Sequence, residues 1–196
     1  MMRACIGMGG IKKFFRKGIH GGHVRHNTYH LHGSGVGSQT EMIAHDHSVT
    51  MDLPAMMGGS DKGMQPVELF LASLCGCEQA TALFIARNMN PRVYIEKIEF
   101  DVFGERDNKG AISLPINLES DAYPPAMLTR IWGQAKVYTS ATSSELEFIA
   151  KEVKRRCPIA GMVIAAGCNL EISYEKAADA SSSDDEDTCD LGAGNS

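Results

Sequence analysis

The chain has 196 residues, 43% of them hydrophobic, and a formal net charge of −5 from 19 Lys and Arg against 24 Asp and Glu. This length predicts one domain of about 120–150 residues with tails. The acidic balance argues against nucleic acid as a main partner, and no uncharged apolar run reaches the roughly 18 residues that a membrane span needs, so we expect no membrane partner.

Basic residues dominate the start of the chain. Residues 1–40 contain six Lys and Arg and no Asp or Glu. The glycine-rich residues 1–23 predict a flexible basic arm, although the same features suit an organelle-targeting presequence. No secretory signal with an adequate apolar core is visible, so we expect the six cysteines to be free thiols in a reducing compartment. We therefore expect a cytoplasmic protein, with a mitochondrial location as the alternative.

Residues 24–52 predict β structure. Residues 29–32 and 41–51 flank the turn-rich residues 33–38, which indicates an antiparallel hairpin with a long tip. Side chains alternate along a strand, so two histidine pairs would each share one face, namely His30 with His32 and His45 with His47. Four imidazoles on a hairpin would suit zinc or copper. Histidines in strands are more often ordinary half-polar residues, so we expect no metal site.

A long helix is predicted over residues 66–88. Pro66 suits the first helical position, and the residue before Pro91 is pushed out of helical geometry, which ends the helix. Apolar side chains fall on every side of the 3.6-residue period, and a helix that is apolar all round is expected to be buried all round. The helix carries Cys75 and Cys77, which project about 200° apart and cannot chelate one ion together.

The rest of the chain predicts strands before and after further helices. Alternating or apolar runs indicate strands over residues 93–104, 112–118 and 131–139 and a final strand around 170–174. Residues 177–196 contain six acidic residues and no Lys or Arg. Such a segment cannot form a core, so we expect an acidic disordered tail.

A helical region precedes the final strand. The capping box at residues 142–145 starts a helix with one apolar stripe. Pro158 ends this helix and can begin a second one, which places Cys157 at the N-cap of the second helix. Because that position is adjacent to Arg155 and Arg156, we expect it to favour a thiolate.

Two thiols therefore stand out as candidates for chemistry. Cys77 lies within a buried helix and Cys157 at a helix start, about eighty residues later. Such a pair suits a couple that shuttles between dithiol and disulfide. For any single cysteine, a small inert hydrophobic role is the more common outcome.

Several segments in a fixed order resemble the OsmC/Ohr superfamily. These segments are His47–Pro54 (HSVTMDLP), Gly58–Gly63 (GGSDKG), Pro66–Cys77 (PVELFLASLCGC) and, much later, Cys157–Ile159 (CPI). The resemblance covers residues 24–176 as one OsmC-like domain and leaves both tails outside. It implies an α+β fold in which a strongly curved antiparallel β-sheet wraps around a long central helix, and in which two subunits intertwine into an obligate homodimer.

The resemblance also implies a peroxidase-type oxidoreductase that reduces organic hydroperoxides and hydrogen peroxide. Cys77 falls on the position that attacks the peroxide and becomes a sulfenic acid, and Cys157 falls on the position that resolves it as a disulfide. Sulfenic acids do condense with nearby thiols in this way. An external dithiol, such as a lipoyl protein or a thioredoxin-like protein, would reduce the disulfide, and no cofactor is implied.

The sequence departs from the better-studied peroxidase branches at two supporting positions. Those branches carry a carboxylate directly after the helix-starting proline, where this chain has Val67, with Glu68 one residue later. They also use an arginine from the loop after the first strands, whereas residues 33–39 contain none. Arg25, or a basic residue of a second subunit, would have to substitute. These departures leave open a second function, a non-catalytic dimer that binds a small apolar or thiol ligand.

Overall fold

The computed structural model describes residues 27–112 and 126–178. The arm 1–23, most of the expected strand 112–118 and most of the acidic tail lie outside these ranges. The described elements follow one another as β1 (His32–Val36), β2 (Gln39–Ala44), β3 (His47–Met51), the short 3-10 helix η1 (Ala55–Met57), α1 (Pro66–Asn88), β4 (Ile95–Arg106), α2 (Lys109–Ile112), β5 (Leu128–Thr139), α3 (Ser143–Arg156), α4 (Pro158–Ala165) and β6 (Asn169–Lys176).

The predicted long helix is confirmed as α1, with Pro66 in its first turn and Glu68 capping it. Within the single described chain, α1 is not buried on all sides. Phe84 is 58% exposed, and one face of the helix is buried, formed by Leu74, Glu78, Ala82, Ile85 and Ala86. Among the described helices α1 alone has the length and apolar composition of a membrane span, a combination that core helices of soluble proteins share.

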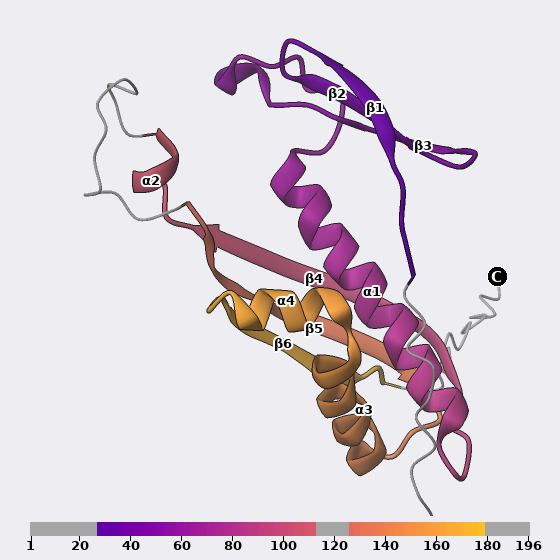
Figure 1. The fold of residues 1–196 in the computed structure, drawn as a ribbon. Helices are drawn as coiled ribbons and strands as arrows, with labels where there is room; N and C mark the ends of the chain where they lie inside the picture. Colours follow the sequence, from indigo (N-terminus) through magenta and orange to yellow (C-terminus); the bar gives the residue numbers. More distant parts are fainter. Residues whose placement is uncertain (1–26, 113–125, 179–196) are drawn as a thin grey trace, which may run out of the picture.

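The main sheet has the order β4–β5–β6, and α1, α3 and α4 lie on one of its faces (Figure 1). The alternation predicted for β4 is confirmed, because Ile98 is buried while Lys97 and Glu99 are exposed. The expectation of a purely antiparallel sheet is wrong, because β4 and β5 are antiparallel but β5 and β6 are parallel. The crossover through α3 and α4 returns the chain to the same end of the sheet, which parallel pairing requires.

The first three strands form a separate sheet near the N-terminal end of α1 (Figure 1). The predicted hairpin is wrong in detail, because the expected tip contains β1, and the expected strand 41–51 is divided into β2 and β3. His45 turns the chain between them with a φ of 55°. Gly33 suits the interior of β1, since a Cβ there would lie 2.1 Å from the carbonyl oxygen of Glu41.

A buried carboxylate fixes the loop between β3 and α1. Asp52 is 1% exposed, and it accepts a hydrogen bond from Ser38 Oγ at 2.7 Å. It also accepts bonds from the backbone N–H groups of Leu53, Ser60 and Lys62 at 2.8, 3.0 and 3.2 Å. The bond from Ser38 is the largest influence that holds the pKa of Asp52 below its usual value. Both oxygens are thus used to hold the loop that leads into α1.

Candidate active site

The structure brings Cys77 and Cys157 together from distant parts of the chain. Cys77 lies in the middle of α1, and Cys157 lies between α3 and α4. The prediction that Cys157 caps α4 is confirmed, because its Sγ accepts a hydrogen bond from the backbone N–H of Ala160 at 3.4 Å and Pro158 occupies the first turn. The Cys77 and Cys157 side chains are close enough to interact, because the Cys77 thiol contributes to the raised pKa of Cys157.

The two thiols differ in their access to solvent. Both are free, and Cys77 is partly exposed, whereas Cys157 is 1% exposed. A reagent arriving from solvent therefore reaches Cys77 more readily than Cys157. The other thiols in the described chain are Cys75, which is partly exposed, and the buried Cys168.

The expectation that Cys157 favours a thiolate is wrong. Burial, followed by its contact with Cys77, raises the pKa of the Cys157 thiol to about 11. The two neighbouring arginines do not reverse this effect, because their side chains are 61% and 46% exposed and both pair with Glu152, at 2.7 Å from Arg155 and 2.6 Å from Arg156. Their hydrogen bonds lower the pKa of Glu152 to about 2. Desolvation thus outweighs the helix N-terminus and the nearby cations at this thiol.

Cys77 opens onto a cavity of about 820 Å³, which we call the thiol cavity, lined by Asn27, Tyr29, Cys77, Ala80, Thr81, Phe84 and Arg156. Its wall combines the segment before β1, one face of α1 and the last residue of α3. Arg156 brings a cation to the same cavity as Cys77. Arg155 forms the same type of ion pair with Glu152 but is not part of this lining.

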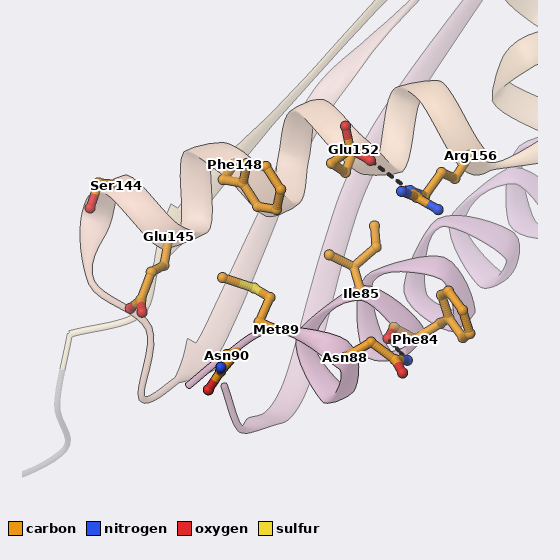
Figure 2. Close-up of a pocket in the computed structure, with 10 residues that line it drawn as sticks. All are labelled: Phe84, Ile85, Asn88, Met89, Asn90, Ser144, Glu145, Phe148, Glu152 and Arg156. Atoms are coloured by element: carbon orange, nitrogen blue, oxygen red, sulfur yellow. Dashed lines mark hydrogen bonds and ion pairs between the residues drawn. The ribbon is translucent and has the colours of Figure 1, made fainter. Parts of the chain in front are cut away.

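A second cavity, of about 510 Å³, lies between the C-terminal part of α1 and α3 and shares Phe84 and Arg156 with the thiol cavity. Figure 2 shows Arg156 at the end of α3, joined to Glu152 and reaching toward α1. Ile85, Met89 and Phe148 give this second cavity an apolar wall. A small molecule with an apolar body can therefore lie beside the cation.

Glu68, a predicted supporting residue, does not lie beside Cys77 in the described structure. Glu68 caps α1 by accepting a hydrogen bond from the Gln65 backbone N–H at 2.9 Å. It is nine residues before Cys77, which is about 13 Å along a helix axis. Arg25 lies outside the described residues. From the sequence, Arg25 is expected to supply a cation near the thiol. In this structure Arg156 lines the same cavity as Cys77 and can supply that charge.

A buried carboxyl next to the thiol pair was not predicted. Glu78 is 0% exposed, and its Oε2 accepts a hydrogen bond from Tyr174 Oη at 3.1 Å. Its Oε1 has no hydrogen-bond partner among residues 27–112 and 126–178. Burial is the main cause that raises the pKa of Glu78, and burial also raises the pKa of Tyr174 above its usual range. A charged residue directly after Cys77 in an otherwise apolar helix was the sequence signal for it.

The histidine pairs do not form a metal site within the described residues. The rings of His30 and His32 stack with their centroids 5.9 Å apart. No group of three or more His, Cys, Asp or Glu side chains in residues 27–112 and 126–178 is arranged to hold a metal ion.

Comparisons with known proteins agree with this fold. The model of the OsmC-like protein family matches residues 59–173, more than half of the chain. The chain is similar to the solved structure of an OsmC-like protein from Mycoplasma pneumoniae, with 20% identity over 78% of this chain and 99% of that one and a TM-score of 0.61. No curated protein matches the chain.

Two further solved structures are of organic hydroperoxide resistance proteins. The one from Legionella pneumophila is 16% identical over 76% of this chain and 97% of that one, with a TM-score of 0.54. The one from Elizabethkingia anophelis is 14% identical over 78% and 100%, with a TM-score of 0.55. At these identities the likeness shows a shared fold.

The raised pKa of Glu78 predicts how the substitution Glu78→Gln changes stability with pH. The folded chain keeps the Glu78 proton to a higher pH than the unfolded chain, whose carboxyl titrates near 4.5. From about pH 4.5 up to the raised pKa, the folded state binds more protons, so the free energy of unfolding falls as pH rises. Glu78→Gln lacks this loss, so its stability relative to wild type should increase steadily across that window, as measured by urea unfolding.

Glu171→Gln is the matched control for this measurement. Glu171 is exposed and paired with Arg130 at 2.6 Å, and its pKa is lowered chiefly by that bond. Glu171 therefore stabilises the folded state above the usual carboxyl pKa, and this stabilisation is lost as pH falls. The pH dependence is opposite to that expected for Glu78. Identical pH slopes in wild type and Glu78→Gln would contradict a carboxyl that ionises with difficulty.

Proposed function

We propose that this chain, which belongs to the OsmC-like protein family, reduces organic hydroperoxides with Cys77 and Cys157 as its redox-active pair. The observation that carries the proposal is the interaction between two free thiols from distant parts of the chain, one partly exposed and one buried. Two of the solved structures that share its fold are named organic hydroperoxide resistance proteins, which agrees with a peroxide-related role.

The chemistry begins at the exposed thiol. The Cys77 thiolate attacks the terminal oxygen of the hydroperoxide, the O–O bond breaks, and the alkoxide takes up a proton to leave as an alcohol. Cys77 is then a sulfenic acid. Arg156 lines the same cavity, so its guanidinium can stabilise the negative charge that moves from sulfur to the leaving oxygen.

The second step uses the buried thiol. Cys157 attacks the Cys77 sulfur, the disulfide forms, and the sulfenic oxygen leaves as water. An external dithiol, such as a lipoyl or thioredoxin-like protein, then returns the pair to thiols by exchange. Because the two thiols already interact, the disulfide forms without a large chain movement.

The alternative function is binding without turnover. The thiol cavity has a volume of about 820 Å³, within the range of small-molecule sites, and the high pKa of Cys157 slows disulfide formation in the absence of a base. A non-catalytic dimer that holds a small apolar or thiol ligand next to Cys77 is compatible with these features.

Peroxide treatment should distinguish these two functions. With tert-butyl hydroperoxide, the wild-type protein should lose two free thiols and about two mass units as the disulfide forms. Cys157→Ser should stop at a Cys77 sulfenic acid that dimedone traps, and Cys77→Ser should not react. Cys75→Ser, which changes the neighbouring thiol on α1, is the control and should behave as wild type. Unchanged thiols in the wild-type protein would leave ligand binding as the function.

Arg156 should contribute to the first step. We expect Arg156→Ala to lower the rate constant for Cys77 oxidation by about 10- to 100-fold, less than the loss of a buried oxyanion donor, because Arg156 is 46% exposed. Arg155→Ala is the matched control, because Arg155 also pairs with Glu152 but does not line the thiol cavity. Stopped-flow oxidation under single turnover measures both, and equal rates in the two variants would exclude Arg156 from this role.

We also propose that the working form is a homodimer. The exposed side of α1 carries Phe70 and Phe84, which are 37% and 58% exposed, and every residue of β1 is exposed. A second copy would cover these apolar surfaces, as expected for a helix that is apolar all round.

Sedimentation equilibrium tests the dimer directly. The protein should have twice the mass of one chain at micromolar concentration, and Phe84→Glu should shift it toward the monomer, because a charge on the covered face opposes association. Phe103→Glu, on an exposed residue of β4, is the control. A monomer at all concentrations would refute the proposal.

A further inference from the structure

The described chain contains two buried carboxylates, and they differ in one respect. Asp52 and Glu78 are both nearly inaccessible to solvent. Asp52 receives four hydrogen bonds that use both of its oxygens. Within the described residues, Glu78 receives one, from Tyr174, and its Oε1 has no partner. The hydrogen bonds of Asp52 therefore account for both of its oxygens, whereas the described hydrogen bond of Glu78 accounts for one of its two.

Stability does not explain an acid at position 78. Burying an ionisable group without a full set of partners costs free energy. A glutamine would accept the same hydrogen bond from Tyr174 with no cost of ionisation. A carboxyl at this position makes physical sense where a group that can gain and lose a proton is needed.

Such a group is needed next to Cys157. This thiol is 1% exposed, so a base in solution does not reach it, and its pKa of about 11 leaves roughly one thiolate in ten thousand at pH 7. The thiol must lose its proton to attack the oxidised Cys77. Glu78 follows Cys77 on α1. Tyr174 packs against the same buried core cluster that contains Cys157, and the Cys157 charge contributes to the raised pKa of the phenol.

We propose that Glu78, acting through Tyr174, is the positioning residue that takes up the Cys157 proton when that thiol attacks the Cys77 sulfenic acid. The inference rests on the proposed function and concerns its second step. The bond between the Cys157 and Cys77 sulfurs forms while the S–O bond of Cys77 breaks. The departing hydroxide receives the proton back from Glu78 and Tyr174 and leaves as water, so the pair ends as it began.

The groups that face this pair are consistent with that role. Within the described residues, the positive charge of Lys154 on α3 lowers the pKa of Glu78, but burial raises it by more. Cys75, one turn before Glu78 on α1, is made harder to ionise by burial and then by the Glu78 charge. The Glu78 charge therefore disfavours reaction at Cys75.

The experiment follows disulfide formation by single turnover with tert-butyl hydroperoxide, acid quenching, alkylation and mass spectrometry. In Glu78→Gln, dimedone should trap the Cys77 sulfenic acid at the wild-type rate, while the disulfide should form about 100-fold more slowly. The wild-type rate should level off once the carboxyl has ionised. The variant's rate should keep rising about tenfold per pH unit, because Cys157 must then ionise unaided.

Two further variants complete the test. Tyr174→Phe removes the group between the carboxyl and the thiol and should show the same slow step, so it carries the test if Glu78→Gln does not fold. Glu171→Gln changes an exposed carboxylate on the same strand as Tyr174 and should behave as wild type. Wild-type rates and pH profiles in both Glu78→Gln and Tyr174→Phe would overturn the proposal.

Failure of the proposed function gives a different result. In that case peroxide oxidises no thiol in the wild-type protein. Diamide, a thiol oxidant, still drives the Cys77–Cys157 disulfide, and its second step needs the same loss of the Cys157 proton. A slow diamide reaction in both site variants would support the role of Glu78 without any peroxidase activity, and wild-type diamide rates in both would contradict it.

Discussion

The contact between the Cys77 and Cys157 side chains is the interaction on which the proposed chemistry depends. It exists because α1 packs against both α3 and α4, and because the interface is built from fully buried apolar residues such as Leu74, Ile149 and Val153. Pro158 begins a new helix immediately after α3, and this change of direction leaves Cys157 at the N-cap, next to α1. Packing between rigid helices, rather than a flexible loop, sets the relation of the two sulfurs.

The thiol pair has an exposed cation near one of its thiols and a buried carboxyl–phenol pair close by. On the outer side Arg156 offers a positive charge in a solvent-accessible cavity, where negative charge arises when a peroxide is cleaved. On the inner side Glu78 and Tyr174 form a buried acid pair, where a proton must be moved. The proposed cleavage of the peroxide and the proposed proton transfer would thus each have a chemically suited group near the thiol pair.

Local signals in the sequence were sufficient for the elements that carry the site. Pro66, the capping box at 142–145 and Pro158 each act within one turn of helix, and all three helices were found from them. The pairing of β6 with β5 was not foreseen, because strand direction depends on the crossover and not on the strand residues. The pKa of Cys157 was misjudged for a similar reason. Neighbours in sequence suggested a thiolate, whereas burial by distant segments decides its ionisation.

Glu78 illustrates the limit of reading a helix from its sequence. In the sequence it is one of two acidic residues in α1, and Glu68 and Glu78 have the same intrinsic preference for water. Glu68 lies in the first turn, where it caps the helix, while Glu78 lies where α1 faces Tyr174. The difference between a cap and a buried acid arises from the strand β6, which lies almost one hundred residues away in sequence. A residue type that is costly in that environment lies next to the thiol pair, and the proposed proton chemistry of those thiols gives a reason for it that the folding of the helix does not.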